Sequence, residues 1–267
     1  GGSILRPTFG LHPLRFVRGL ALAAVKHGAN ISINSEVVEW VSDSRGHLLR
    51  TREGSVRARN VVVATNGFSP ELLHPQLMGV TLPMISAIVV TRPLTNAELQ
   101  AQHWKTDCPA ITAVNLMNYF RLLPDKRFLF GGRGSSDGSA EDAKRNYAKL
   151  ISRFREVFPE WQEIDIEYQW HGLICMTRRL TPAIGRFVED PSVFFGFGYH
   201  GNGVNTAIWS GKQVARWLAT SKESSIAKPS WLPDVVYGMP ARFPLAALRL
   251  RYIGAQVAIM TLADKLS

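Results

Sequence analysis

Residues 192–218 read SVFFGFGYHGNGVNTAIWSGKQVARWL, and the rest of the chain can be ordered around them. The apolar run at 193–197 predicts a buried strand, and the glycine-dense segment at 198–203 predicts a turn. From Val204 onward apolar residues recur at helical spacing, so a helix is expected. A strand, a glycine turn and a helix N-terminus suit a polar or anionic ligand, because free backbone N–H groups and the positive end of the helix dipole face it. The alternative is an ordinary strand-to-helix connection in an α/β protein.

A second strand and loop resemble this arrangement. The β-branched run at 60–64, NVVVA, has no polar face, which is typical of a strand buried on both sides in a parallel sheet. Ser69 and Pro70 follow shortly after and are expected to start a helix. Ligands of open α/β sheets bind outside the C-terminal ends of the strands. The loops at 64–67 and 198–203 are therefore expected to border one crevice.

The chain before this strand predicts a helix and a meander. Apolar residues share one helical face over 14–27, and Gly28 is placed as the C-terminal stop. Four short extended segments are expected to follow, at 30–33, 36–41, 47–51 and 55–59.

The pattern changes between residues 81 and 170. Strands are expected at 84–91, 119–123, 127–132 and 167–175, with one helix at 140–158. Locally paired strands with a helix on them predict an antiparallel α+β domain inserted between two pieces of an α/β domain. A polar linker is expected at 222–228. A helix is expected at 241–266, packed against the main body or, alternatively, on a membrane surface.

The composition limits the kinds of protein to which this chain can belong. The chain has 267 residues, of which 46% are hydrophobic and 19% charged, as in a globular protein of one large or two small domains. Cys108 and Cys175 make neither a metal motif nor a disulfide framework, which favours a reducing, cytoplasmic compartment. The net charge of +10 is scattered, so we expect no nucleic-acid partner but an anionic ligand such as a dinucleotide. We expect no signal peptide and no transmembrane segment, since the apolar stretch at 252–263 is too short to span a bilayer.

Six stretches, in this order, resemble the C-terminal part of the FAD-dependent amine and D-amino-acid oxidase superfamily. They are LHPLRFVRGLALAAVKHGANI (11–31), SEVVEW (35–40), NVVVATNG (60–67), YFRLLPDKRFLFGGRG (119–134), WHGLICMTRRLTPAIGR (170–186) and GFGYHGNGVNTAIWSGKQVA (196–215). The gamma-glutamylputrescine oxidase branch is the most similar, through the YFR…GGR hairpin and the segment before PAIGR.

The resemblance implies an α/β fold with a divided FAD-binding domain. A partial Rossmann-type domain of the glutathione-reductase kind would carry an inserted antiparallel α+β substrate domain. The expected boundaries are 1–78 and 173–221 for the FAD-binding pieces, 79–172 for the substrate domain, and 222–267 for a linker and helical tail.

The resemblance also implies roles for individual residues in binding FAD. Val37 would lie near the adenine, and the helix N-terminus after the glycine turn would face the flavin ring and stabilise its reduced, negatively charged form. His200 would be a turn histidine packed beside the cofactor rather than a general base. The full expected set is Val37, Ala64, Thr65, Asn66, Gly67, Gly172, Gly198, His200, Gly201, Asn202, Gly203 and Val204. Each has a structural alternative, as an ordinary strand or turn residue.

Three residues are candidates for the substrate pocket. Tyr119 and Arg121 lie on the expected hairpin, and Trp170 would approach the flavin together with Gly172. The alternatives are a half-buried sheet tyrosine, a solvated surface arginine and a core tryptophan. A covalent flavin link through Cys175 is not expected, because its offset from Thr177 does not match.

Two departures from the family pattern limit these expectations. Where glycine- and D-amino-acid-oxidising members have an arginine that clamps the substrate carboxylate, this chain has Ile174, which argues against a simple α-amino acid as substrate. Arg178 and Arg179 lie close enough in sequence to leave that role open. The family also begins with a βαβ unit bearing G-x-G-x-x-G, a spacing that Gly1, Gly2 and Gly10 do not make. We therefore expect a fragment, a truncated product or one piece of a split protein.

The expected activity is flavin-dependent oxidation of an amine. A hydride would pass from the carbon beside the substrate nitrogen to flavin N5, leaving an imine, and O2 or an electron carrier would reoxidise the flavin. No side-chain base is required. The alternatives are a pseudo-oxidase that folds or partners another subunit without turnover, and a nicotinamide-dependent dehydrogenase.

Overall fold

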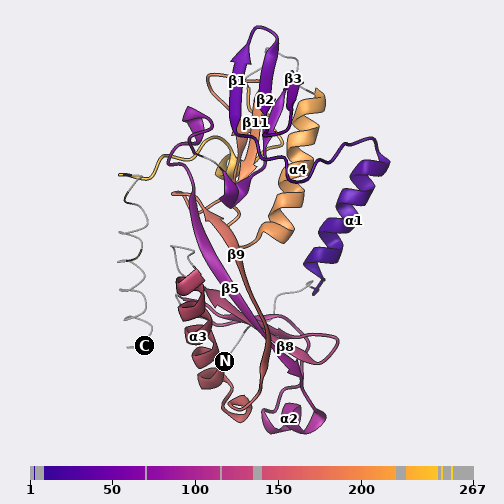
Figure 1. Cartoon of the computed structure of the whole chain (residues 1–267), viewed down its shortest axis with the longest axis vertical. Coiled ribbons are helices and arrows are strands. Elements are labelled where there is room, and N and C mark those ends of the chain that lie inside the picture. The colour runs from indigo at the N-terminus through magenta and orange to yellow at the C-terminus, as the bar shows by residue number, and fades with distance from the viewer. Residues whose placement is uncertain are drawn as a thin grey trace. The chain divides into compact units, whose positions relative to one another are not determined.

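The computed structural model describes residues 3, 9–69, 71–114, 116–134, 140–220, 227–245, 248 and 254. The chain divides into two compact units. Unit 1 comprises residues 1–12, 84–173 and 251–267, and unit 2 comprises residues 13–83 and 174–250. Helices and strands occur in both units (Figure 1), so the chain is a mixed α/β protein, as the sequence predicts.

Unit 2 begins with helix α1 (Pro13–Lys26), which confirms the helix expected at 14–27. Gly28 has a φ of 89°, and its N–H donates to the carbonyl of Val25 at 2.9 Å, so the helix ends where the glycine predicts. The strand expected at 30–33 is wrong. These residues lie outside every strand and Ile33 is 80% exposed, because no neighbouring strand in the described residues supplies the ladder hydrogen bonds that a strand needs.

The meander that follows is an antiparallel sheet of three short strands in the order β1-β2-β3 (Figure 1). They are β1 (Glu39–Asp43), β2 (Gly46–Arg50) and β3 (Ser55–Ala58). The extended segments predicted at 36–41, 47–51 and 55–59 are therefore confirmed, with shifted ends. Val37 lies before β1 rather than in it. Beyond the start of β1, its pairing with β2 continues through the N–H of Val38, which donates to the carbonyl of Arg50 at 2.8 Å.

The second sheet of unit 2 brings together distant parts of the chain. Its order is β10-β11-β4, with β10 (Ala183–Arg186), β11 (Val193–Phe197) and β4 (Val61–Val63). Strand β11 runs parallel to β4 and antiparallel to β10. Helix α4 (Gly203–Thr220) lies beside β11 (Figure 1) and shares a core with the strands through Ile184, Phe194, Val214 and Trp217. The strand and helix predicted at 193–197 and from Val204 are confirmed.

Two details around β4 differ from prediction. Val62 is 44% exposed, so this strand is not buried on both faces; α4 packs on β10 and β11 rather than over β4. No helix starts at Ser69 in the described residues either. Ser69 instead follows a single 3₁₀ turn, η1 (Asn66–Phe68), and a second such turn, η2 (Pro75–Leu77), comes before strand β5 (Leu82–Pro93). Pro70 lies outside the described residues.

Buried His47 joins the meander to the loop that precedes β11. Its Nδ1 accepts from the indole N–H of Trp40 at 3.2 Å and lies 2.9 Å from the hydroxyl of Ser42. Its Nε2 lies 2.7 Å from the hydroxyl of Ser192, which donates to Asp190. Because the contact between His47 and Ser192 spans 145 positions of sequence, the network fixes the meander on the sheet.

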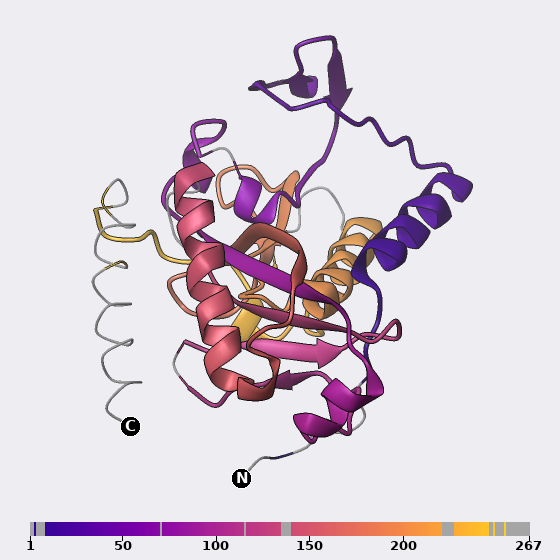
Figure 2. The same cartoon turned by 60° about the horizontal axis from the view of Figure 1, so that its bottom comes forward.

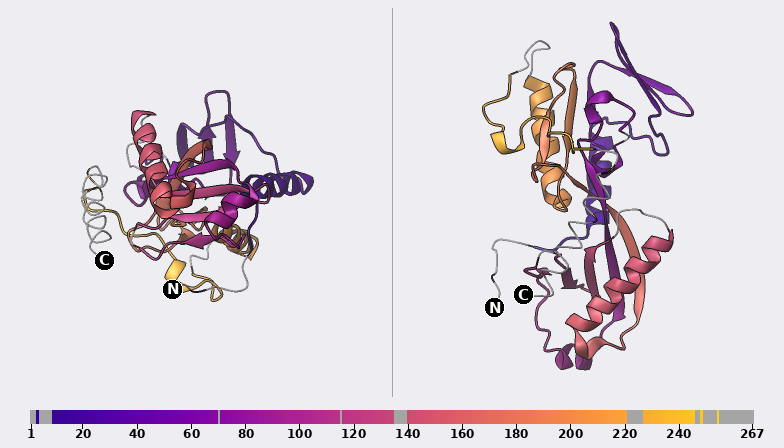
Figure 3. Two further views of the ribbon diagram at one scale, coloured as in Figure 1. Left: turned by 90° about the horizontal axis from the view of Figure 1, so that it is seen from below. Right: turned by 90° about the vertical axis from the view of Figure 1, so that its left-hand side faces the viewer.

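Unit 1 is built on a sheet of five strands in the order β6-β7-β8-β5-β9. The strands are β5 (Leu82–Pro93), β6 (Ala110–Ile111), β7 (Tyr119–Leu122), β8 (Arg127–Arg133) and β9 (Ile166–Met176). Helix α3 (Ala140–Val157) lies along one face of this sheet (Figures 1 and 3), in front of the strands in the view of Figure 2. Phe128 and Phe130 of β8 meet Phe154 of α3 in its core, where Trp161 is fully buried. The strands and helix predicted for this region are confirmed; β6 and the short helix α2 (Asn96–Ala101) were not predicted, nor was β10 of unit 2.

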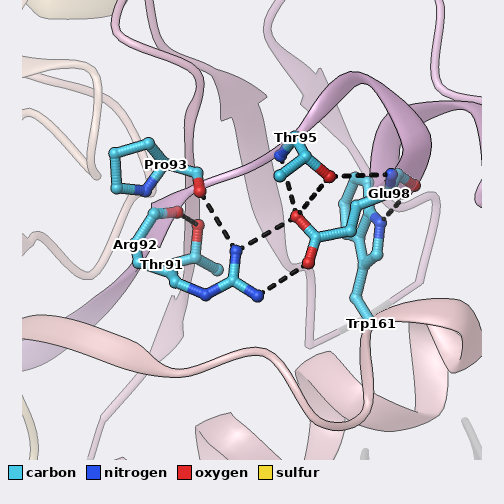
Figure 4. A network of polar contacts seen from close by, with 6 residues as sticks. All are labelled: Thr91, Arg92, Pro93, Thr95, Glu98 and Trp161. Atoms are coloured by element: carbon cyan, nitrogen blue, oxygen red, sulfur yellow. Dashed lines mark hydrogen bonds and ion pairs between the residues drawn. The ribbon is translucent and has the colours of Figure 1, made fainter.

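Helix α2 (Asn96–Ala101) is fixed at its start by a polar network (Figure 4). The hydroxyl of Thr95 accepts from the N–H of Glu98 at 3.2 Å, and the N–H of Thr95 donates to the Glu98 carboxylate at 2.8 Å, a capping box. Arg92 donates to both carboxylate oxygens, at 3.0 and 2.6 Å, and Trp161 donates to the Glu98 carbonyl. The bonds from Arg92, then those from Thr95, lower the pKa of Glu98 to about 2.

The C-terminal predictions are largely beyond the described residues. Of the linker expected at 222–228, only residues 227 and 228 are described, and of the helix expected at 241–266, only 241–245, 248 and 254. Residues 241–245 form a loop and a turn rather than a helix. Within the described ranges, no helix combines the length and the apolar character needed to cross a membrane.

Candidate functional site

Two loops of unit 2 meet at one edge of the β10-β11-β4 sheet. Because β4 and β11 are parallel neighbours, their C-terminal ends lie at the same edge. The side-chain oxygen of Asn66 accepts from the backbone N–H of Gly198 at 3.0 Å, across 132 positions of sequence. Asn66 has a φ of 48°, a left-handed conformation that asparagine tolerates. The expectation that loops 64–67 and 198–203 are neighbours is therefore confirmed.

The glycine turn after β11 has an unusual backbone. Gly198, His200 and Gly201 all have positive φ, at 77°, 52° and 89°. A Cβ on Gly198 would lie 2.3 Å from Cγ2 of Thr177, so only glycine fits there. A Cβ on Gly201 would meet no atom within 4 Å, so one part of the turn is packed by the protein and another part is open.

Helix α4 starts directly after this turn. The N–H groups of Asn205 and Thr206 donate to the carbonyl of Asn202, at 3.1 and 2.9 Å. The N–H groups of Gly203 and Val204 find no acceptor among the described residues, as expected for the first turn of a helix. Together with the helix dipole, these two donors favour a negatively charged or electron-rich group.

The turn also contains a spacing that our sequence analysis missed. Gly196, Gly198 and Gly201 make G-x-G-x-x-G between a strand and a helix. The context is not that of a dinucleotide fingerprint, because α4 begins two residues after Gly201 and no parallel strand follows α4 in the described residues. The pattern alone therefore does not assign a pyrophosphate site.

His200 is held as a neutral acceptor. Its Nε2 accepts from the N–H of Thr177 at 3.3 Å, and its own backbone N–H donates to the carbonyl of Cys175 at 3.0 Å. Burial lowers the pKa of His200. The His200 side chain accepts a backbone hydrogen bond and thereby positions the turn; its role beside a cofactor stays a prediction.

Cys175 is buried, and Arg179 is bonded to backbone carbonyls. Burial raises the pKa of the Cys175 thiol to about 11, so the thiol stays protonated at neutral pH. Arg179 donates to the carbonyls of Pro182, Val236 and Tyr237, each at 2.8 Å. These three bonds to backbone carbonyls tie the loop that holds Arg179 to the loop at 236–237.

The other predicted cofactor residues lie in accessible positions. Ala64 and Thr65 are exposed, Val37 and Gly67 are half-buried, and the hydroxyls of Thr65 and Ser69 lie 2.6 Å apart. Their binding roles remain predictions.

In unit 1, the predicted substrate residues share one sheet face. Phe120 and Leu122 of β7 pack against the α3 core, so Tyr119 and Arg121 point to the opposite face. On β9, Nδ1 of His171 is 2.7 Å from the hydroxyl of Tyr147 on α3. Its sequence neighbours Trp170 and Gly172 therefore also point away from α3. Trp170 is 44% exposed, and a Cβ on Gly172 would meet no atom within 4 Å.

Tyr119 lies across the middle of this face. Its ring covers Gly131, where a Cβ would come within 2.2 Å of the ring, and its hydroxyl is 2.8 Å from that of Ser86 on β5. Burial raises the pKa of Tyr119, so the phenol stays protonated and remains a donor.

Two residues of this face were missed by the sequence analysis. Ser86 and Arg133 are register partners in the pairing of β5 with β8, next to Tyr119. A Cβ on Gly132 would meet Leu150 of α3, so Arg133 points to the Tyr119 face. The signal was present in the quoted GGRG stretch, since Arg133 and Gly131 differ by the two-residue period of a strand.

Comparisons with known proteins agree with this arrangement. A family model described as "FAD dependent oxidoreductase" matches residues 1–217. The chain is 34% identical over 233 residues to a probable oxidoreductase OrdL of Haemophilus influenzae, covering 85% of this chain and 52% of that protein. It is 27% identical over 258 residues to the gamma-glutamylputrescine oxidoreductase of Escherichia coli, covering 94% of this chain and 58% of that protein. The chain thus spans a little more than half the length of these relatives.

Solved structures show the same fold. The crystal structure of glycine oxidase from Geobacillus kaustophilus matches with a TM-score of 0.62 and 22% identity, over 79% of this chain and 57% of that chain. The L-proline dehydrogenase of P. horikoshii matches with a TM-score of 0.64 and 21% identity, over 79% and 57%.

Proposed function

Because the chain belongs to the FAD-dependent oxidoreductase (DAO) family, we propose that it takes part in the FAD-dependent oxidation of an amine to an imine. FAD, when bound, supplies the acceptor for the hydride that leaves the carbon beside the substrate nitrogen. The observation that carries the proposal is the junction of the two loops of unit 2 at Asn66 and Gly198, directly before the N-terminus of α4. O2 or an electron carrier would be the final acceptor.

Four features of the residues present fit a flavin. The backbone at Gly201 is open to approach, and the unpaired N–H groups of Gly203 and Val204 supply donors for an electron-rich ring edge. The loop at 64–67 runs beside this turn, as a groove-lining segment should. Finally, the helix dipole of α4 stabilises the negative charge that a reduced flavin carries.

The substrate side of the proposal rests on unit 1. Tyr119, Arg121 and Trp170 would line the pocket from the sheet face opposite α3, with Gly172 leaving room beside Trp170. Their work is to bind the amine and to orient its C–H bond, and orientation of reacting groups lowers the entropic part of the activation barrier. No side-chain base is assigned, because hydride loss from a neutral amine does not require one.

The specific substrate remains part of the proposal. A relative is named for gamma-glutamylputrescine and others for glycine and D-amino acids. Ile174 stands where glycine oxidases are expected to carry an arginine, so we propose an amine other than a simple α-amino acid.

An absorption spectrum tests this function. The purified full chain is incubated with FAD, freed of excess cofactor, and scanned for flavin bands; amines are then screened for peroxide production. Retained flavin bands and amine-dependent peroxide are the expected results. A folded chain that stays colourless contradicts the proposal for this chain and supports a non-catalytic role.

A further inference from the structure

His200 connects the glycine turn to the segment that follows β9. Its backbone N–H donates to the carbonyl of Cys175 at 3.0 Å, and its Nε2 accepts from the N–H of Thr177 at 3.3 Å. Thr177 is fully buried, and its N–H finds no other acceptor in the described part of the chain. One histidine therefore holds the turn to this segment through both its backbone and its side chain.

These contacts determine which ring nitrogen of His200 carries the proton. A backbone N–H can only donate, so Nε2 is unprotonated, and in a neutral imidazole the proton is then on Nδ1. The hydroxyl of Thr177 donates to the carbonyl of Thr181 at 2.8 Å, and its oxygen lies 3.2 Å from Nε2. A proton added to Nε2 would face this oxygen, but the buried N–H of Thr177 would lose its acceptor and meet a second N–H.

The surroundings disfavour a cationic ring at His200. Burial lowers its pKa, and the carbonyl of Thr181 raises the pKa by a smaller amount. The positive end of the α4 dipole, which follows the turn, also opposes a cation. The other titratable groups at 64–67, 175–182 and 198–203 are Cys175, Arg178, Arg179 and Tyr199. Burial raises the pKa of the thiol and of the phenol, so both are neutral at pH 7, and these loops contain no carboxylate that would stabilise a protonated ring.

The shape of the turn depends on this contact because His200 has an unusual backbone conformation. Its φ is 52°, in the left-handed region, between Gly198 at 77° and Gly201 at 89°. A residue other than glycine stays in this region only where its surroundings hold it. Loss of the ring contact therefore allows the turn to relax, and with it the open backbone at Gly201 that the cofactor is proposed to approach.

We propose that His200 is a positioning residue: its neutral ring holds the glycine turn in the shape that binds FAD, and protonation of the ring releases the turn. This inference rests on the proposed function and adds to it a dependence of cofactor binding on the charge of one histidine. The coupling is reciprocal, so FAD opposes proton uptake by His200 as much as the proton opposes FAD.

Nuclear magnetic resonance of the full chain without FAD tests the geometric part. Comparison with His200→Gln identifies the ring signals of His200. We expect the tautomer with the proton on Nδ1 at pH 7.5, a titration midpoint below 6.5, and amide signals of Gly198 and Gly201 that shift with the same midpoint. A proton on Nε2, a higher midpoint, or glycine amides that do not follow the ring would overturn the proposal.

Flavin fluorescence then measures the Kd for FAD between pH 4.5 and 8. We expect a constant Kd above the midpoint of His200 and a rise of up to about 10-fold per pH unit below it, because one proton opposes binding. In His200→Gln the amide oxygen still accepts from Thr177 but does not titrate, so the profile should be flat, with a Kd at pH 8 within about 3-fold of the starting chain. His200→Ala has no acceptor and should bind about 10-fold more weakly at pH 8.

His74 provides the matched control. Burial lowers its pKa as well, but its ring packs against Trp40 and Phe187, so His74→Gln should keep the pH dependence. A flat profile in the starting chain, a pH dependence that persists in His200→Gln, or one that His74→Gln abolishes would overturn the proposal. Absence of FAD binding at every pH would contradict the proposed function, and the resonance measurements on the FAD-free chain would then decide this inference on their own.

Discussion

The bond between Asn66 and Gly198 offers the sharpest test of how the candidate cofactor loops are built. Asn66 contributes in two ways. Its side-chain oxygen satisfies the buried N–H of Gly198, and its backbone adopts a φ of 48°. Aspartate preserves both properties, glycine preserves only the backbone freedom, and alanine preserves neither.

The magnitudes follow from these losses. Leaving a buried N–H unsatisfied costs about 1–3 kcal/mol, which we expect for Asn66→Gly. Placing alanine in the left-handed region adds about 1 kcal/mol, so Asn66→Ala should lose about 2–4 kcal/mol. Asn66→Asp should remain within about 0.5 kcal/mol of the starting protein, because its carboxylate still accepts from Gly198.

Urea unfolding followed by circular dichroism measures this order. The midpoints should fall from Asn66→Asp to Asn66→Gly to Asn66→Ala at unchanged slope, since the surface exposed on unfolding is the same. At a temperature where all variants remain folded, flavin retention should fall in the same order, because the Gly198 turn loses its anchor. Equal stability of Asn66→Ala and Asn66→Asp would show that the hydrogen bond does not hold the loops together, and the reasoning would be refuted.

Three further predictions address the polar network, the helix N-terminus and acid stability. Glu98→Gln should lower the free energy of unfolding by about 1–2 kcal/mol at pH 7, a figure that allows for partial screening of the carboxylate by solvent. The pKa of Glu98 is about 2 in the folded chain and 4.5 in the unfolded chain. In urea melts, the difference in stability between Glu98→Gln and the starting protein should therefore vanish as the pH falls from 4.5 towards 2. Gly203→Ala should fold normally, because its Cβ would contact only Tyr199, at 3.8 Å or more. It should nevertheless retain less flavin than the matched helix control Gly211→Ala. Equal flavin retention in the two variants would argue against close approach of a ligand at the α4 N-terminus. Burial lowers the pKa of His74 and of His200, so the unfolded chain takes up protons first, and thermal melts should show stability falling as the pH drops below about 6.5.

Periodicity in the sequence predicted the elements that carry a strong apolar stripe. The helices at 13–26, 140–157 and 203–220 each have one, and the strand at 193–197 is fully buried, as its unbroken apolar run indicates. The same rule failed at 30–33, where two isoleucines alternate with polar residues but no partner strand pairs with them. It failed again at Val62, because burial of the second face depends on where α4 lies, which local sequence does not encode.

The candidate site was predictable in its parts but not in its contacts. Glycines and a helix start mark the 198–203 turn, yet nothing local shows that Gly198 is satisfied by a side chain 132 positions away. The position of Arg133 was overlooked for a similar reason. Its place beside Ser86 and Tyr119 becomes visible only when the strand order β7-β8-β5 is known.

The glycine turn is held in shape by protein contacts, and this bears on how a ligand would bind there. Gly198 is bonded to Asn66 and packed on Thr177, and His200 is bonded to the Cys175 carbonyl and accepts from Thr177. The three positive φ angles are therefore maintained without a ligand. A ligand that binds a preformed turn pays little to order it, so more of its contact energy appears as affinity. Substitutions at these anchoring contacts should therefore weaken folding and ligand binding together, whereas Gly203→Ala should weaken binding alone. That difference would identify the N-terminus of α4, which follows the open backbone at Gly201, as the binding surface.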